Sequence, residues 1–260
     1  KRLCSLTKVD IAMTESNFGY EKISNKEHSS RVRGIFNKVA NKYDLMNDFM
    51  SLGMQRLWKK TFISSIKSVK NEDQIVIDLA GGTGDIAFKF LEKFPKNNFV
   101  NIIDINQEML NEGRKVSVRK NLLSNCNFIC SPGESIALRN NYADILTIAF
   151  GIRNVSDRKK CLEECFRVLK PGGIFICMEF SMPKDIMLRN LYDIWSYGFI
   201  PKLGKLIVGD ETPYRYLVDS IRTFPNPEEF NDMIIKAGFI SNTIKQLTGN
   251  IVCIYRAEKP

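Results

Sequence analysis

The sequence predicts an α/β protein in which a doubly wound, mostly parallel sheet lies between two layers of helices. Between residues 75 and 179, short apolar runs alternate with segments of helical periodicity. Strands that alternate with helices form right-handed βαβ units, and successive units place helices on both faces of the sheet. A glycine-rich turn follows the first strand, and ligands bind at this carboxyl edge in such sheets.

The expected elements of this sheet follow one another at short intervals. Apolar runs predict strands over residues 75–79, 99–104, 127–131, 143–150 and 173–179. Helical periodicity predicts helices over residues 84–93, 107–122, 157–169 and 227–237. Two closing strands are expected near residues 239–246 and 251–257. A chain of 260 residues can bury a substantial core as one domain.

Three segments lie outside this alternation. Residues 1–27 are expected to be poorly structured, and residues 28–260 to form a single domain. Residues 28–70 are expected to form a helical lid, in which residues 43–51 are irregular. Residues 181–225 are an insertion before the last helix. Their many aromatic residues predict either a cover for the sheet edge or a pocket for a bulky apolar substrate.

The turn at Gly81–Gly84, which follows a strand ending near Asp78, carries the most functional information. Glycines let the backbone approach a ligand closely, and the start of the next helix offers unpaired N–H groups. The following strand ends at Asp104, whose carboxylate can accept hydrogen bonds from both hydroxyls of a ribose. Together these features predict a nucleoside-binding site.

Two classes of cofactor fit this pattern. Residues 82–87 match the dinucleotide pattern G-x-G-x-x-G/A, which is weak when it stands alone. S-adenosylmethionine has the same adenosine, but it carries a sulfonium cation in place of a pyrophosphate. Asp78 and Asp85 flank the turn and would repel a pyrophosphate, so the sequence favours the methyl donor. A third explanation is a turn that only lets the helix pack on the strand.

Composition excludes several other classes of protein. The net charge of +9 comes without zinc-finger spacing or an aromatic-basic repeat, so no nucleic acid is expected as a partner. The cysteines are odd in number and scattered, which indicates a reducing compartment; Cys161 and Cys165 are expected to pack in the core rather than bind a metal. The single histidine, His28, lies in a polar stretch and is expected at the surface, which argues against His-based zinc sites and a Ser-His-Asp triad.

Several segments carry a resemblance to a known family. They read DLAGGTGD (78–85), DINQEML (104–110), FGIRNV (150–155), YDLMN (43–47), RVLKPGG (167–173), EFS (179–181), YRYL (214–217) and SIRTFP (220–225). In combination they resemble the ubiquinone/menaquinone biosynthesis C-methyltransferases, from about Phe18 to the C-terminus. The AGGTGD, FGIRN and YRYL segments are the specific ones, whereas RVLKPGG is common to many methyltransferases.

This resemblance implies an S-adenosylmethionine-dependent, Rossmann-like fold with a seven-stranded sheet. It also implies methylation of a ring carbon of 2-methoxy-6-polyprenyl-1,4-benzoquinol in ubiquinone synthesis. Demethylmenaquinol or another small aromatic acceptor is an alternative, as is a non-catalytic member that binds quinones or organises a biosynthetic complex. The residues expected to contact the cofactor are Asp78, Gly81, Gly82, Thr83, Gly84, Asp104, Ile105, Gly133, Glu134 and Ala149.

At two of these positions the chain departs from the family pattern. Where family members commonly carry Asn-Ala-Glu, this chain has Pro132-Gly133-Glu134. Ala149 stands where bacterial members can carry a serine. A side-chain contact with the cofactor is therefore lost at each position, although the backbone of Gly133 can still serve.

The catalytic candidates are Arg153, Asn154, Tyr43 and Asp44. Arg153 and Asn154 follow the fourth strand at the ligand-binding edge, where Arg153 can stabilise a phenolate or orient a water. An arginine, with a pKa above about 12, is a poor base. Tyr43 and Asp44, in the lid, are therefore expected as proton acceptors or substrate contacts. Alternatively, Arg153 pairs with an acid such as Asp157 and only fixes the loop.

The expected location follows from the acceptor, whose polyprenyl tail stays in lipid. Residues 186–208 mix apolar and basic side chains, and Gly198, Pro201 and Gly204 prevent one spanning helix. An interfacial membrane patch fits this pattern, as does packing on the sheet or in a subunit interface. We expect peripheral attachment to the matrix side of the mitochondrial inner membrane, with the bacterial cytoplasm as the alternative.

The expected partners are the polyprenyl benzoquinol, other ubiquinone-biosynthesis proteins and, in a homodimer, a second copy of the chain. The mitochondrial expectation rests on frequent lysine and asparagine and on residues 1–9. These residues include no acidic residue, as is typical of the end of a transit peptide. The chain begins with Lys1 rather than Met, so an upstream segment is expected.

Overall fold

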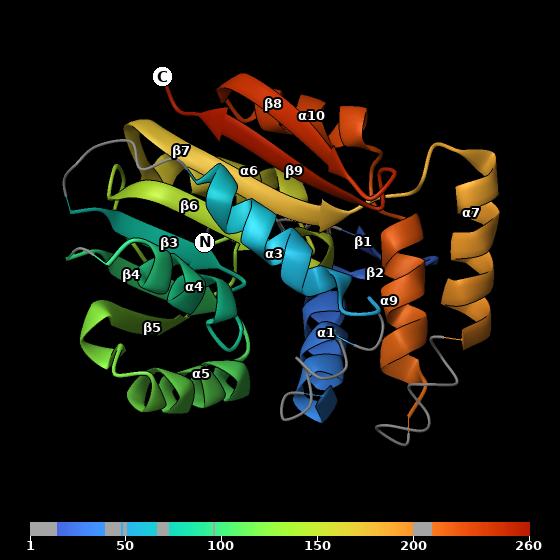
Figure 1. Ribbon diagram of the computed structural model, residues 1–260, viewed down its shortest axis with the longest axis horizontal. Coiled ribbons are helices and arrows are strands. Elements are labelled where there is room, and N and C mark those ends of the chain that lie inside the picture. Colours follow the sequence, from blue (N-terminus) through green and yellow to red (C-terminus); the bar gives the residue numbers. More distant parts are fainter. Residues whose placement is uncertain (1–14, 40–47, 49–50, 67–72, 96, 200–209) are drawn as a thin grey trace, which may run out of the picture.

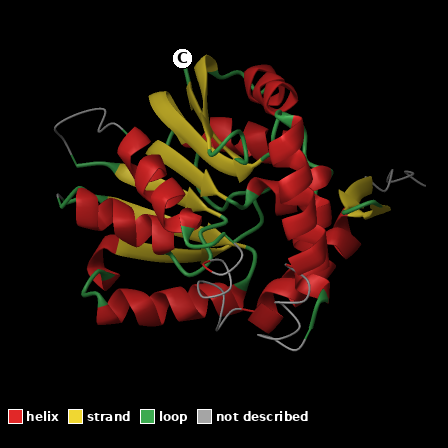
Figure 2. Ribbon diagram, turned by 45° about the vertical axis from the view of Figure 1, so that its right-hand side comes forward, coloured by secondary structure: helices red, strands yellow, loops and turns green. Residues whose placement is uncertain are grey.

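A computed structural model describes residues 15–39, 48, 51–66, 73–95, 97–199 and 210–260. Its strands are β3 (Ile75–Leu79), β4 (Phe99–Asp104), β5 (Cys126–Cys130), β6 (Ala143–Ala149), β7 (Leu169–Phe180), β8 (Ile240–Leu247) and β9 (Val252–Glu258). They form one seven-stranded sheet in the order β5-β4-β3-β6-β7-β9-β8, in which only β9 is antiparallel to its neighbours. Helices lie on both faces of this sheet, so the predicted fold class is confirmed (Figures 1 and 2).

The helices that alternate with these strands also lie where the sequence predicts them. They are α4 (Asp85–Lys93), α5 (Gln107–Arg119), α6 (Arg158–Val168) and α10 (Pro227–Lys236), with short turns η2 (Leu123–Asn125) and η3 (Ile152–Asn154). The main difference is that β7 begins at Leu169 rather than at residue 173. Pairing of Leu169 with Ala143 extends β7 through the Pro-Gly-Gly sequence that was expected to precede it.

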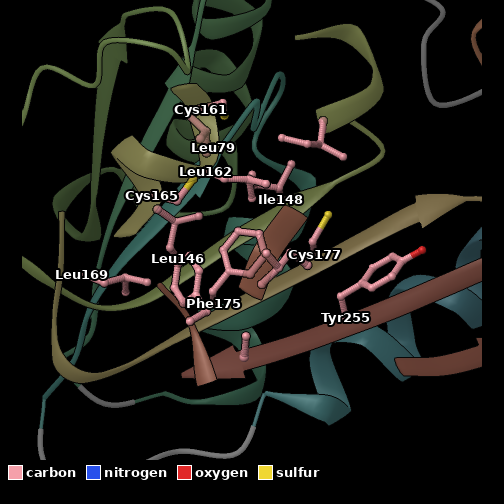
Figure 3. Close-up of a cluster of buried hydrophobic side chains, with 14 of the residues drawn as sticks. Leu79, Leu146, Ile148, Cys161, Leu162, Cys165, Leu169, Phe175, Cys177 and Tyr255 are labelled. Carbon is pink, nitrogen blue, oxygen red and sulfur yellow. The ribbon is translucent and has the colours of Figure 1, made fainter. Parts of the chain in front are cut away.

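The two faces of the sheet bury separate apolar clusters. In β3, Ile77 and Leu79 belong to one cluster and Val76 to the other, as the two-residue period of a strand requires. On the first face Cys161 and Cys165 of α6 pack among the sheet's side chains, which confirms their expected role in the core (Figure 3). Strands covered on both faces explain the nearly continuous apolar runs in the sequence.

The expectation of poor structure up to residue 27 is wrong for residues 15–27. β1 (Glu15–Phe18) and β2 (Glu21–Ser24) form an antiparallel hairpin around Gly19, which has a positive φ of 60°. α1 (Asn25–Val39) follows directly. An isolated hairpin is marginal in water, so contacts from outside the segment stabilise this one.

Those contacts come from the insertion between β7 and α10. The insertion contains α7 (Ile186–Asp193), the π-helix η4 (Ile194–Phe199) and α9 (Thr212–Arg222). α9 lies against β1, α1 and η3. The Phe18 ring stacks on Tyr216 of α9 with 4.5 Å between centroids. No feature of residues 15–27 alone reveals a partner so distant in the sequence.

Within the predicted lid, α1 is followed by α3 (Met54–Ser65), which packs on the second face of the sheet. Most of the stretch expected to be irregular, residues 43–47 and 49–50, lies outside the described residues. The candidate residues Tyr43 and Asp44 belong to that stretch. No helix in the described part of the chain is long and apolar enough to cross a membrane.

Candidate active site

A pocket opens at the carboxyl edge of the sheet, where the strand order reverses. From β3 the chain winds outward through β4 to β5 and then returns to β6 on the other side of β3. Open α/β sheets bind ligands at such a reversal. The pocket contains about 1150 Å³ of empty space, its open mouth included. Its walls come from the turn after β3, the segments after β4, β5 and β6, and α1.

Every predicted cofactor residue except Gly84 lines this pocket. The lining residues from that prediction are Asp78, Gly81, Gly82, Thr83, Asp104, Ile105, Gly133, Glu134 and Ala149. Gly84 is instead the N-cap of α4, with a φ of 83°. A Cβ there would lie 2.7 Å from the Phe88 ring, so Gly84 serves the packing of the helix start.

Two backbone N–H groups hold the Asp104 carboxylate, one from the turn after β3 and one from the segment after β4. The Gly82 N–H donates to its Oδ2 at 2.9 Å, and the Asn106 N–H donates to its Oδ1 at 2.8 Å. Burial raises the pKa of Asp104 to about 6, although these backbone hydrogen bonds oppose the shift. Each carboxylate oxygen has a further lone pair. This donor set therefore fits a ligand that offers two adjacent hydroxyls.

Asp78 holds the glycine turn in place through hydrogen bonds to β6 and to the start of α4. Its carboxylate accepts from Thr147 Oγ1 at 2.9 Å and from the Ala87 N–H, in the first turn of α4, at 3.2 Å. Burial raises the pKa of Asp78 to about 7 against these hydrogen bonds. A Cβ at Gly81 would lie 2.8 Å from the Asp78 carbonyl oxygen, so this position requires glycine.

Two lysines neutralise the charge of Asp85, one of the two acids that favoured a cationic cofactor. Asp85 forms ion pairs with Lys59 of α3, at 2.8 Å, and with Lys89 of α4. Burial opposes ionisation of Asp85, but the two lysines outweigh it and lower its pKa. Its charge is therefore compensated, and the other carboxylates that line the pocket are those of Asp78, Asp104 and Glu134. Lys59 lines the pocket, and the sequence analysis missed it.

Arg153 does not line the pocket. Its side chain is buried, and its Nη1 donates to Glu179 Oε1 at 2.9 Å and to the Phe150 carbonyl at 2.5 Å. The alternative in which Arg153 fixes the loop has the support of this geometry, but the suggested partner is wrong. The acid is Glu179 of β7, because Asp157 caps α6 by accepting from the Lys160 N–H at 2.9 Å.

Asn154, the neighbouring candidate, does line the pocket. Its Oδ1 accepts a hydrogen bond from Tyr216 Oη at 3.1 Å. Because β6 and β4 lie on opposite sides of β3, Asn154 and Asp104 stand on different sides of the pocket. Asn154 is therefore placed away from the site expected for the ribose.

α1 supplies a pocket wall that the sequence analysis did not assign. The contributing side chains are Ser29, Val32, Arg33 and Phe36. Their helical spacing was recognisable, but their contact with the β3 turn depends on how α1 packs. His28 of the same helix is 1% exposed, so its predicted surface position is wrong. The ring of Phe18 in the hairpin covers it edge-on, at 5.9 Å between centroids.

Comparison with known proteins agrees with this geometry. A model of the ubiE/COQ5 methyltransferase family matches residues 24–259. The chain belongs to the ubiE/COQ5 methyltransferase family. It is 46% identical over 250 residues to the ubiquinone/menaquinone biosynthesis C-methyltransferase UbiE of Rickettsia bellii, covering 95% of this chain and all of the relative. UbiE of Brucella abortus is 43% identical over 245 residues, covering 94% of this chain and 91% of the relative.

Solved structures agree on the fold. An S-adenosylmethionine-dependent methyltransferase from Aquifex aeolicus superposes with a TM-score of 0.56 at 18% identity, covering 76% of this chain and 89% of that one. The [4+2]-cyclase SpnF superposes with a TM-score of 0.65 at 14% identity, covering 89% and 96%. Because a cyclase shares this fold, the fold alone does not establish the activity. The activity follows instead from membership of the methyltransferase family. The chain is an S-adenosylmethionine-dependent C-methyltransferase.

The pH dependence of cofactor binding tests the assignment of Asp104. Ribose hydroxyls donate best to an ionised carboxylate, and the pKa of Asp104 in the unliganded protein is about 6. Lowering the pH from about 7.5 to about 5.5 protonates about three quarters of this group, so its titration should lower affinity for S-adenosylmethionine by up to about fourfold. Isothermal titration calorimetry measures this change.

Asp104→Ala is the matched variant. It should bind the cofactor more weakly by roughly 1–3 kcal/mol, because a charged acceptor is lost. Its affinity should also depend less on pH. Unchanged affinity in a folded variant would mean that Asp104 does not hold the ribose.

Stability measurements test the role of Arg153. Arg153→Ala leaves the carboxylate of Glu179, which is 0% exposed, without its arginine partner. Removing one member of a buried ion pair costs about 3–5 kcal/mol of unfolding free energy, whereas replacing both with apolar residues is often neutral. Urea denaturation should therefore show a large loss for Arg153→Ala and recovery in Arg153→Met/Glu179→Leu.

Kinetics separate this structural role from direct catalysis. If Arg153 stabilises the phenolate itself, the Met/Leu double variant should be stable yet slower by about 100-fold in kcat, with cofactor affinity little changed. A stable double variant that keeps the wild-type rate would rule out the catalytic prediction for Arg153.

Proposed function

We propose that the chain transfers a methyl group from S-adenosylmethionine to a ring carbon of 2-methoxy-6-polyprenyl-1,4-benzoquinol, in ubiquinone synthesis. The observation that carries this proposal is the family match, with curated relatives at 43–46% identity that are named ubiquinone/menaquinone biosynthesis C-methyltransferases. The pocket supports it, because the apolar side chains of Val32 and Phe36 line it together with the amide of Asn154. A flat apolar ring that bears hydroxyl groups matches such a wall.

The bound cofactor supplies an electrophilic methyl group on a sulfonium. The ring carbon forms the new C–CH₃ bond as the S–CH₃ bond breaks, and the proton displaced from that carbon leaves to a base or water. Asp104 and the glycine turn hold the ribose and so fix the position of the methyl group. Tyr43 and Asp44 stay our proposed proton acceptors or substrate contacts, although they lie outside the described residues.

The acceptor becomes a better nucleophile as its hydroxyl proton departs. An N–H donor or a positive charge beside the ring oxygen stabilises the phenolate that forms. Asn154 and Arg33 both line the pocket and can supply these two groups. The quinone form lacks this electron-rich ring, so we propose that only the reduced quinol is a substrate.

Transfer of a labelled methyl group tests this function. We expect the purified enzyme to methylate a short-chain 2-methoxy-6-prenyl-1,4-benzoquinol under reducing conditions, with the new methyl group on a ring carbon by NMR. The oxidised quinone serves as the matched control and should not react. Methylation of demethylmenaquinol or another aromatic acceptor instead would correct the substrate, whereas tight cofactor binding without any transfer would favour a non-catalytic protein.

We also propose that the enzyme reaches its lipid-dissolved acceptor through peripheral membrane contact. α7 and the first residue of η4 carry an apolar face formed by Met187, Leu191 and Ile194, each at least 60% exposed and spaced to lie on one side of a helix. On its other side Leu188 approaches Gly249 closely, and Asp193 pairs with Arg222. An apolar helix face on a basic protein fits an anionic bilayer surface.

Liposome co-sedimentation tests this membrane contact. Binding to anionic vesicles should fall as salt rises, and Met187→Ser/Leu191→Ser should reduce it severalfold. Ile235→Ser, at an apolar position of α10 that is 49% exposed, is the control and should bind like wild type. Light scattering covers the alternative: a variant that turns a homodimer into monomers while still binding vesicles would make this face a subunit interface.

The location in the cell follows from the source of the chain. For a eukaryotic source we propose the matrix side of the mitochondrial inner membrane, in contact with other ubiquinone-biosynthesis proteins. The two relatives named above are bacterial, which supports the alternative of a bacterial protein. Residues 1–9, on which the mitochondrial prediction partly rests, lie outside the described residues.

A further inference from the structure

Among the contacts of the described residues, the hydroxyl of Tyr216 is the only side-chain group that hydrogen bonds to the Asn154 side chain; the other partner is the backbone carbonyl of Phe150. We propose that Tyr216 is a positioning residue, which holds the amide of Asn154 so that its N–H faces the oxygen of the acceptor ring. This inference deepens the proposed function and rests on it, since it assumes an acceptor with a ring hydroxyl.

Both neighbours of the Asn154 amide fit the same orientation, and Tyr216 holds the amide in it. The Phe150 carbonyl can only accept, and it lies 3.5 Å from Nδ2. Tyr216 Oη lies 3.1 Å from Oδ1, on the other half of the amide. A separation of 3.5 Å makes a weak hydrogen bond at best. The bond from Tyr216 is therefore the stronger constraint, and without it the amide is much freer to rotate.

The hydroxyl of Tyr216 is a reliable donor. Burial raises its pKa to about 12, although the positive charges of Arg153 and Arg158 oppose the shift. The hydroxyl therefore keeps its proton throughout the physiological pH range. Since it donates to Oδ1, the amide N–H₂ remains available for Phe150 and for the pocket.

The ring of Tyr216 is fixed as firmly as its hydroxyl. It is 6% exposed, packs with Val32 and Ile35 of α1, and stacks on Phe18 with an angle of 24° between the rings. The hairpin, α1 and α9 thus meet around a single aromatic side chain. Val32 also lines the pocket, so this cluster sets both the apolar wall and the donor beside it.

The position of Asn154 makes an oriented N–H useful to the reaction. It lies beyond β6, on the side of the pocket opposite Asp104. With the ribose at Asp104, the part of the pocket left for the acceptor ring would include the β6 side, which Asn154 lines. An N–H at this point stabilises the ring oxygen as negative charge develops on it.

Tyr216→Phe tests the inference, because it removes the hydroxyl and keeps the ring. We expect kcat for the quinol to fall about three- to tenfold, which is the effect of one neutral hydrogen bond. Affinity for S-adenosylmethionine, measured by calorimetry, should not change. Tyr214→Phe is the matched control: Tyr214 lies on the same helix, is 1% exposed, and its hydroxyl has no hydrogen-bond partner among the described residues. Its kcat should equal that of wild type.

A double-mutant cycle shows whether Tyr216 acts through Asn154. In an Asn154→Ala background, Tyr216→Phe should cause no further loss of kcat, because the group that it positions is absent. The same loss in both backgrounds would overturn the inference, as would wild-type kcat in Tyr216→Phe alone. A fall in cofactor affinity equal to the fall in kcat would mean a general structural role and would also overturn it.

Different results would contradict the proposed function and the positioning role of Tyr216. If the wild-type enzyme transfers no methyl group to the quinol, the proposed function is wrong. If the wild-type and Tyr216→Phe enzymes methylate the quinol at equal rates, the function stands and only the positioning role falls.

Discussion

The buried ion pair between Arg153 and Glu179 is the constraint on which the acceptor side of the pocket depends. It ties η3, which follows β6, to the adjacent strand β7, and Arg153 also closes onto the Phe150 carbonyl. A charge pair buried this deeply holds its geometry, because separating the charges leaves each without solvent or partner. Asn154 is the next residue along the chain, so its place on the pocket wall is set by this pair.

On the cofactor side of the pocket, the buried carboxylates of Asp78 and Asp104 have different roles. Asp78 turns inward to the start of α4 and to Thr147, so it shapes the glycine turn rather than reaching for a ligand. Asp104 is held by backbone N–H groups and keeps acceptor capacity toward the pocket. Burial raises the pKa of both carboxyls, and a bound cation with ribose hydroxyls would favour their ionised forms.

The choice of acceptor belongs to elements added around the sheet. The cyclase SpnF shares the fold, so the fold by itself does not define the substrate. Here α1 forms a wall of the pocket, and α9 and the hairpin support it through the cluster of Phe18, Val32 and Tyr216. The substrate-side surface is thus assembled from three segments that are far apart in the chain.

The sequence by itself determined the sheet, its helices and the cofactor side of the pocket. Those features depend on local periodicity and on short spacings, such as the one between the glycine turn and Asp104; neighbouring strands bring Gly82 of that turn to Asp104. Only the tertiary structure decided the pairs Arg153–Glu179, Lys59–Asp85 and Tyr216–Asn154 and the burial of His28. Asp157 is the near acid in sequence, but Glu179 is the near acid in space. Which side chains meet depends on how whole faces of helices and strands pack, and no local pattern records that.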